Sequence, residues 1–193
     1  MSKPLRIALF GGSFDPVHLG HVEIARAAVQ ALGLNLVIFI PCRQSPHKER
    51  GTSADEAERL RMLELATAEL PWAEVSDLET YLPPPSYSWV TAEMMHEIFP
   101  TDRRFWLMGE DQWAALDSWA RSDYLAELVE FIIHSRGGTP APNPAYRAHV
   151  IQGDHPAAAS VIRRDAPEHL HRDWLHPEVA RFISSTGLYN CRD

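Results

Sequence analysis

The sequence predicts an α/β fold in which helices cover both faces of a parallel sheet, the arrangement called doubly wound. Strongly apolar runs of strand length lie at 7–10, 36–40, 104–108 and 130–134, and shorter strand candidates lie at 72–75 and 149–151. Runs that are apolar on both faces are typical of strands inside a parallel sheet. Helical periodicity between the runs favours strand–helix–strand units. We expect one domain over residues 1–193, with a helical C-terminal part from about residue 157.

The first strand leads into a glycine-rich turn and then into a helix. The run at 7–10 is followed by the turn at 11–21 and by helical periodicity at 22–32. Glycines allow a close approach of the backbone, and the free N–H groups at a helix start attract anions. His18 and His21 are three residues apart, so on a helix they share a face. Two imidazoles beside free amides suit a polyphosphate better than a metal, because no carboxylate or thiolate is spaced to complete a metal site.

A cationic loop follows the second strand. Residues 41–50 contain Arg43, His47, Lys48 and Arg50, in a chain with a net charge of −8. Ligands of parallel sheets bind beyond the carboxyl ends of the strands, so this loop should lie near the histidines. We interpret it as a flexible phosphate clamp, and a solvated loop is the alternative.

These two segments resemble a known family. The turn Gly11-Gly12-Ser13-Phe14-Asp15-Pro16-Val17-His18-Leu19-Gly20-His21 resembles the signature of the nucleotidylyltransferase superfamily, in the version found in bacterial nicotinate-nucleotide adenylyltransferases. Pro46-His47-Lys48 matches the Pro-His-Lys element of the same family, in which the lysine approaches the nucleotide phosphates. The resemblance implies a Rossmann-like fold of the nucleotidylyltransferase type. The residues of the turn that it implies for ATP binding are Gly11, Gly12, Ser13, Phe14, His18 and His21.

The family's third motif, Ile-Ser-[Ser or Ala]-Thr-x-Ile-Arg, has two candidates near the C-terminus. Residues 183–189 match its first letters, but they lack the arginine, and the glycine at 187 is typical of a helix end. Residues 157–163 keep the arginine and precede a predicted helix, so we choose them. Ala158 then stands where the family has a serine, which puts ATP affinity in doubt. The implied ATP contacts of this stretch are Ser160, Ile162 and Arg163, and Arg163 joins His18, His21 and Lys48 as an implied catalytic residue.

A proline-rich loop and a helix at 91–99 carry the implied nicotinate site. Ser86-Tyr87-Ser88 stands where the family has Ser-Tyr-Thr, and a simple helix N-cap is the alternative. Flat pyridine rings bind well against aromatic faces, and the family pattern favours Trp119 for stacking and assigns Trp113 to the core. The implied contacts of the nicotinate nucleotide are Ser13, Lys48, Ser86, Tyr87, Ser88, Trp119 and Arg136.

The segment after the strand at 104–108 is implied to contact ATP. Gly109 and Asp111 fit the family's Gly-x-Asp, and the aspartate is a candidate acceptor for a ribose or for a helix start.

Several charged and polar residues are interpreted as structural. Ser53 to Glu56 has the spacing of a capping box. We expect the arginines of the helix that follows to be mostly solvated, with Arg61 at a family position but structural. Four histidines have no common zinc spacing and are interpreted as surface residues, namely His155, His169, His171 and His176.

Composition limits the classes of function. The net charge of −8 argues against broad nucleic-acid binding. No stretch is apolar for long enough to span a membrane, and nothing resembles a signal peptide. With only two cysteines, the simplest expectation is a cytoplasmic protein. A homo-oligomer is left open.

From the residues alone, we expect a Rossmann-like enzyme that holds a nucleoside triphosphate. The family resemblance implies transfer of an adenylyl group from ATP to nicotinate mononucleotide, with Mg²⁺ bound to the ATP phosphates. The alternatives are pantetheine-phosphate or another adenylyltransferase, a cytidylyltransferase, and a nucleotide-binding module without activity.

Overall fold

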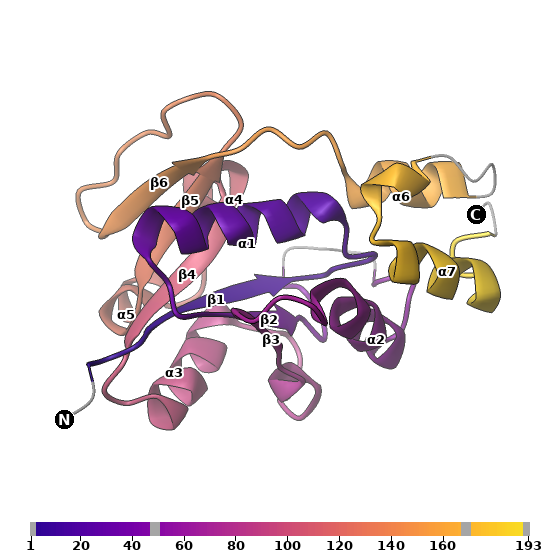
Figure 1. Ribbon diagram of the computed structural model, residues 1–193. Coiled ribbons are helices and arrows are strands. Elements are labelled where there is room, and N and C mark those ends of the chain that lie inside the picture. The colour runs from indigo at the N-terminus through magenta and orange to yellow at the C-terminus, as the bar shows by residue number, and fades with distance from the viewer. Residues whose placement is uncertain (1–2, 47–50, 167–170, 191–193) are drawn as a thin grey trace.

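The computed structural model describes residues 3–46, 51–166 and 171–190. Within them, six strands form one parallel sheet in the order β3-β2-β1-β4-β5-β6 (Figure 1). The strands are β1 (Arg6–Gly12), β2 (Leu36–Pro41), β3 (Ala73–Val75), β4 (Arg103–Gly109), β5 (Glu130–Ser135) and β6 (Ala148–Gln152). All pairs are parallel, with Leu9 opposite Ile38 on one side and Trp106 on the other. The chain changes winding direction between β1 and β4, and ligands of such sheets bind beyond the strand ends at that point.

Helices cover both faces of the sheet, as the sequence predicted. They are α1 (Leu19–Leu32), α2 (Glu56–Thr67), α3 (Ser88–Ile98), α4 (Glu110–Ala114), α5 (Ser122–Leu128), α6 (Ala159–Asp165) and α7 (Pro177–Thr186). Strand side chains alternate between the faces, so β1 directs Ala8 and Phe10 to one apolar cluster and Ile7 and Leu9 to the other. The first cluster includes α1, α2, α6 and α7, and the second includes α3 and α5. In Figure 1, α1 therefore lies above the sheet and α3 below it.

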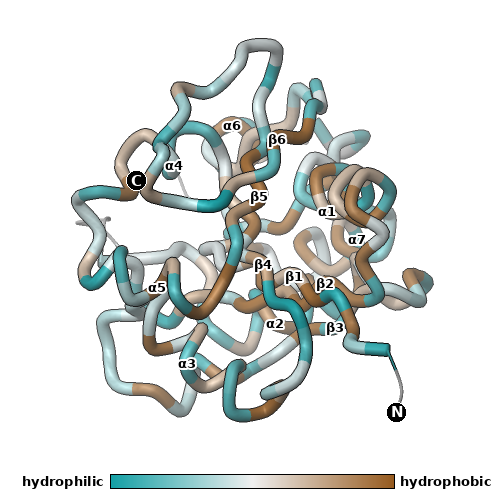
Figure 2. The backbone as a smooth tube through the Cα atoms, turned by 90° about the vertical axis from the view of Figure 1, so that its left-hand side faces the viewer, coloured by the Kyte–Doolittle hydropathy of each residue, from teal (hydrophilic) through white to brown (hydrophobic). Residues whose placement is uncertain are grey.

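The hydrophobic residues follow this layering. Figure 2 shows hydrophobic stretches along the strands in the middle of the molecule. Within the described residues, no helix is both long enough and apolar enough to cross a membrane.

Three helix starts differ from the sequence predictions. α1 begins at Leu19, with His18 as its N-cap, so the helix includes His21 in its first turn. α3 begins at Ser88, three residues before the predicted start, and Tyr87 is its N-cap. The capping box of α2 is formed by Asp55 and Glu58, each accepting the other's backbone N–H at 2.8 Å.

Asp55 and not Ser53 is the N-cap of α2, and the N–H of Ser53 donates to Asp15 at 2.8 Å. The capping-box prediction used only the spacing of neighbouring residues, and that spacing contains no information about a contact with residue 15.

The C-terminal helices are consistent with the choice of residues 157–163 over residues 183–189 for the third motif. α7 ends at Thr186, and Gly187 caps it in the left-handed region with φ of 72°, so residues 183–189 form a helix end. α6 starts within residues 157–163, and its Ile162 joins the first apolar cluster. In Figure 1 both helices lie near the end of β1, where the phosphate-binding turn was predicted.

Candidate functional site

The turn between β1 and α1 is tightly packed. A side chain at Gly11 would place its Cβ 3.0 Å from the Trp106 indole, and one at Gly12 would place its Cβ 3.1 Å from the Phe14 ring. Phe14 has a φ of 45°, and its ring lies against His21 with centroids 5.0 Å apart. Both glycines end β1 and are needed for this packing, so contact between their backbone and a ligand stays a prediction.

The two histidines stack on each other at the start of α1. Their ring centroids are 3.7 Å apart, and the backbone N–H of His18 donates to Nδ1 of His21 at 3.2 Å. Nδ1 of His21 is therefore an acceptor, which leaves the ring proton on Nε2. His18 is only 7% exposed, and its Nδ1 has no hydrogen-bond partner. Burial, together with the nearby His155 and Arg136, lowers the pKa of His18 to about 4, so the free protein holds this imidazole neutral at pH 7.

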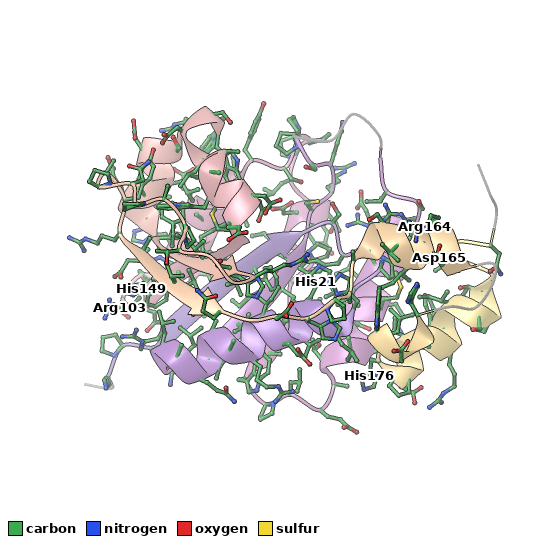
Figure 3. The ribbon with its side chains drawn as sticks, turned by 90° about the horizontal axis from the view of Figure 1, so that it is seen from above. His21, Arg103, His149, Arg164, Asp165 and His176 are labelled. Atoms are coloured by element: carbon green, nitrogen blue, oxygen red, sulfur yellow. The ribbon has the colours of Figure 1, made fainter. Side chains whose placement is uncertain are left out.

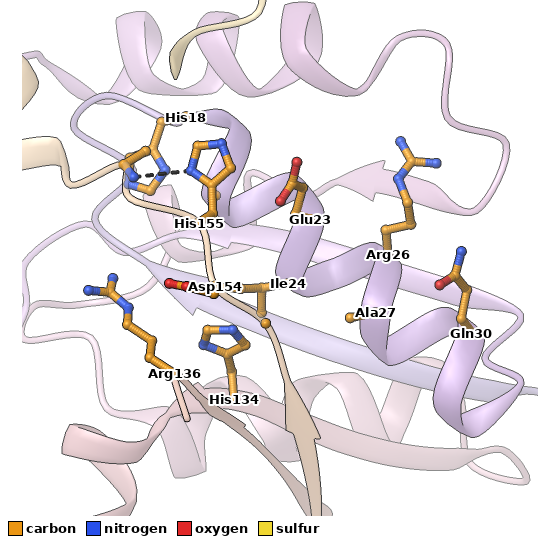
Figure 4. Close-up of a pocket in the computed structure, with 13 residues that line it drawn as sticks. His18, Glu23, Ile24, Arg26, Ala27, Gln30, His134, Arg136, Asp154 and His155 are labelled. Atoms are coloured by element: carbon orange, nitrogen blue, oxygen red, sulfur yellow. Dashed lines mark hydrogen bonds between the residues drawn. The ribbon is translucent and has the colours of Figure 1, made fainter. Parts of the chain in front are cut away.

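A pocket of about 290 Å³ opens beside His18. It lies between α1 and the segments that follow β5 and β6 (Figure 4). At one end are His18, His155 and Arg136, and at the other end are Arg26 and Gln30 of α1. The remaining lining residues are Gly20, Glu23, Ile24, Ala27, His134, Gly153, Asp154 and Ala157. Nitrogen-bearing side chains thus line both ends of the pocket, and one end touches the turn.

Arg136 directly follows β5 and lines this pocket, and its contact with a substrate stays a prediction. Its guanidinium forms no hydrogen bond or ion pair with the part of the chain that the structure describes. Figure 3 shows that the ion-paired Arg103 and His149, both bound to Glu130, lie far from His21 and take no part in this site.

Arg163 of α6 lies against the turn. Its Nη1 donates to the backbone oxygen of Asp15 and lies 3.8 Å from the Asp15 carboxylate. That carboxylate is 5% exposed and accepts hydrogen bonds from Ser53 N at 2.8 Å, Ala54 N at 3.0 Å and Tyr189 Oη at 2.8 Å. Asp15 thereby connects the turn with the start of α2 and with the C-terminal segment. Through its contact with Asp15, Arg163 lies at the same turn as His18 and His21.

Ser160 and Ile162 have different environments. Ser160 is exposed, while Ile162 is buried in the first apolar cluster. Ala158 is the N-cap of α6 and has no side chain that can cap it.

Arg59 is a site-supporting residue that sequence reasoning missed. It was expected to be solvated, yet it is 1% exposed, and its Nη1 donates to the backbone oxygens of Ser13 at 3.0 Å and Cys42 at 2.8 Å. The guanidinium therefore joins the ends of β1 and β2. Arg59 is three and four residues before the buried Met62 and Leu63. That helical spacing places it on the inner face of α2 and was the pattern that could have revealed it.

The predicted phosphate clamp is only partly consistent with the structure. Arg43 is engaged by its own chain, because its guanidinium donates to Leu82 O at 3.2 Å and pairs with Glu56 at 3.3 Å. Arg43 is thus a structural residue in this conformation. Lys48, like His47 and Arg50, lies outside the described residues.

Three residues of the implied nicotinate site, Ser86, Tyr87 and Ser88, lie where the loop after β2 meets the start of α3. Ser86 Oγ accepts hydrogen bonds from Arg43 N at 3.0 Å and Gln44 N at 3.2 Å, so it holds the loop after β2 against the start of α3. Tyr87 and Ser88 are the N-cap and the first residue of that helix. The N-cap alternative therefore holds for Tyr87, although its side chain forms no cap hydrogen bond.

Two tryptophans follow β4. Trp113 is buried, and its Nε1 donates to Ala141 O at 2.8 Å, which confirms it as a core residue. Trp119 is partly buried against the second apolar cluster. Asp111 is exposed on α4, and its Oδ1 would lie 2.6 Å from a Cβ at Gly109, so a side chain at that position would have to displace this carboxylate.

The three C-terminal histidines that the structure describes are partly buried, and each has a contact that the sequence spacing did not indicate. His155 lines the pocket beside His18. His171 bonds Asp165 at 3.0 Å and stacks on Trp174, and His176 caps α7. His169 lies outside the described residues. Across residues 3–46, 51–166 and 171–190, no group of three histidine, cysteine or acidic side chains is placed to hold a metal ion.

Comparisons with known proteins identify the family of the chain and support its fold. Residues 9–188 match the family described as "Cytidylyltransferase-like". A protein of Neisseria meningitidis serogroup C, named "Probable nicotinate-nucleotide adenylyltransferase", is 34% identical over 95% of this chain and 98% of its own length. A protein of the same name from Methylacidiphilum infernorum is 40% identical over 68% of this chain and 64% of its own length. Among solved structures, the nicotinic acid mononucleotide adenylyltransferase of Plasmodium falciparum complexed with NaAD has a TM-score of 0.81. It shares 17% identity, over 97% of this chain and 98% of that one.

Proposed function

Because the chain belongs to the cytidylyltransferase-like family, and within it to the nicotinate-nucleotide adenylyltransferases, we propose that it transfers the adenylyl group of ATP to nicotinate mononucleotide. The products are deamido-NAD and pyrophosphate, and the reaction is a step of NAD biosynthesis. The structural observation that supports this proposal most is the buried His18 at the start of α1, whose Nδ1 has no partner among the described residues and whose ring stacks on His21, with Arg163 bound to Asp15 of the same turn.

ATP binds with its phosphates at the turn between β1 and α1. The N-terminus of α1 supplies free N–H groups, and His18 and His21 supply imidazole donors. A phosphate anion beside His18 favours the protonated ring and so opposes the burial that holds its pKa low. The proposed ATP contacts remain Gly11, Gly12, Ser13, Phe14, His18, His21, Gly109, Asp111, Ser160, Ile162 and Arg163. Of these, Ile162 acts through its backbone, because its side chain is buried.

Nicotinate mononucleotide binds next to ATP, with contacts from both sides of the turn. Ser13, Ser86, Tyr87, Ser88, Trp119 and Arg136 are the proposed contacts, together with Lys48, which lies outside the described residues. Trp119 offers a ring for stacking against the pyridine.

The reaction is an in-line displacement in which the 5′-phosphate of the mononucleotide attacks the α-phosphorus of ATP and pyrophosphate leaves. Such transfers need positioning and charge stabilisation more than covalent chemistry. His18, His21, Lys48 and Arg163 donate to the phosphate oxygens on which negative charge grows. Mg²⁺ arrives with ATP as part of the substrate and is held by phosphates and water.

The decisive experiment measures pyrophosphate release from ATP with three acceptors, namely nicotinate mononucleotide, nicotinamide mononucleotide and phosphopantetheine, and repeats the first with CTP. We expect the highest kcat/KM with ATP and nicotinate mononucleotide. Turnover of phosphopantetheine instead, or a preference for CTP, would replace the proposed reaction with another nucleotidyl transfer. ATP binding without turnover of any acceptor would identify an inactive nucleotide-binding module.

A further inference from the structure

His155 shares one end of the pocket with His18, although it comes from the segment between β6 and α6. Figure 4 shows the two rings side by side at the end of the pocket that touches the turn. A Cβ at Gly20 would lie 3.0 Å from Nδ1 of His18 and 3.3 Å from Nδ1 of His155. The missing side chain at Gly20 is therefore what lets both imidazoles occupy this corner.

The hydrogen bonding of His155 fixes which nitrogen can donate. The backbone N–H of Ala157 donates to Nδ1 of His155 at 3.1 Å. A nitrogen that accepts carries no proton, so in the neutral ring the proton is on Nε2. The described residues provide no other hydrogen bond to this ring, so its Nε2–H is left for a ligand or for water.

The surroundings of His155 favour an anion with several oxygens. His18 and the Arg136 guanidinium line the same end of the pocket, and neither Nδ1 of His18 nor the guanidinium has a partner among the described residues. The carboxylates that also line the pocket are Glu23 on α1 and Asp154 next to His155, and both are exposed. These three nitrogen groups come from the start of α1, the end of β5 and the segment before α6. Groups spread in this way suit a polyphosphate, which has several oxygens, better than an anion with a single charged group.

We infer that His155 donates its Nε2–H to the triphosphate of bound ATP and so provides a donor that the third motif of this chain lacks at Ala158. This inference rests on the proposed function, because it takes ATP as the nucleotide. Ala158 has no hydroxyl to offer, while His155 precedes it by three residues and faces the pocket. His155 is thus a binding residue for ATP, distinct from the histidines of the first turn.

Two substitutions separate this role from a structural one. His155→Asn keeps an acceptor near Nδ1 for the Ala157 N–H, in an Asx-turn, but removes the donor at Nε2. His155→Gln places an amide N–H near the position of Nε2 but loses the acceptor for the turn. We expect the Kd for ATP, measured by calorimetry, to rise about tenfold to a hundredfold in His155→Asn and only a few-fold in His155→Gln. Gln30→Ala, at the far end of the pocket, is the control and should leave the Kd near that of the wild type.

Adenosine is the second probe, because it lacks phosphates. Its affinity should be the same in the wild type and in both His155 variants. The inference is overturned if His155→Asn binds ATP as well as the wild type. It is also overturned if the asparagine variant binds better than the glutamine variant, or if adenosine is weakened as much as ATP. If the wild type turns over ATP and any of these results is found, only the role of His155 is refuted and the proposed function stands. If the wild type binds no ATP, the proposed function is refuted as well.

Discussion

The hydrogen bond between Tyr189 and Asp15 should contribute measurably to stability, although it joins residues at opposite ends of the chain. Tyr189 Oη donates to Asp15 Oδ1 at 2.8 Å, and the carboxylate also accepts two backbone N–H groups of the segment before α2. Burial and the Asp15 carboxylate raise the pKa of Tyr189 above its usual value, so the hydroxyl remains a donor at every pH in ordinary use. Tyr189→Phe removes this donor and keeps the ring.

The magnitude follows from the charge and burial of the acceptor. A hydrogen bond to a charged group contributes about 1.5–3 kcal/mol, so Tyr189→Phe should lower the free energy of unfolding by about 2 kcal/mol. Asp15→Asn should cost about 3 kcal/mol or more, because its amide nitrogen would face a backbone N–H that the carboxylate now accepts. In the Asp15→Asn background the tyrosine bond is neutral and contributes about 1 kcal/mol, which predicts a coupling of about 1 kcal/mol.

Urea denaturation followed by tryptophan fluorescence measures these differences in a double-mutant cycle. Tyr81→Phe is the matched control, because the Tyr81 hydroxyl also bonds a carboxylate, Asp77 at 3.1 Å, but its side chain is 78% exposed. That change should cost less than about 0.5 kcal/mol. A loss in Tyr189→Phe no larger than in the control, or additive effects of the two changes at Tyr189 and Asp15, would refute the role assigned to this contact.

The remaining predictions concern the turn itself. His18→Ala should lower kcat about 10²–10³-fold while the protein remains folded, with some loss of stability because the side chain is buried; a variant with more than about half of wild-type kcat would exclude His18 from the mechanism. Because the pKa of His18 falls to about 4 in the folded protein, the unfolded state binds more protons below pH 6.5. The free energy of unfolding should then drop by about 3 kcal/mol as the pH falls from 6.5 to 4. Urea titrations at several pH values should show a smaller decline in His18→Asn. An equal decline in both proteins would contradict the lowered pKa of His18. Arg59→Met should cost about 2–4 kcal/mol and raise the KM for ATP, because two carbonyl groups that position the turn lose their donor, and an unchanged KM would show that Arg59 does not support the site.

The sheet could be predicted from the sequence because strands that are buried on both faces consist almost entirely of apolar residues. The central runs are apolar on both faces, and each was placed within two residues of its observed bounds. The turn with His18 and His21 could be predicted equally well, since it combines a strand end, a helix start and two histidines at helical spacing.

The contacts that hold the site together were not predictable in the same way. Asp15 accepts bonds from residues 53, 54 and 189, and Arg59 donates across the ends of two strands. Such contacts depend on which loops meet in space, and a local pattern does not contain that information. His155 was interpreted as a surface residue for the same reason, because its proximity to His18 exists only after β6 has joined the sheet.

The central claim is that the turn between β1 and α1 binds the phosphates of ATP. A crystal structure with a non-hydrolysable ATP analogue and nicotinate mononucleotide tests it most directly. Phosphate oxygens should lie within hydrogen-bond distance of both His18 and His21. An analogue seated elsewhere, with both imidazoles turned away from its phosphates, would contradict it.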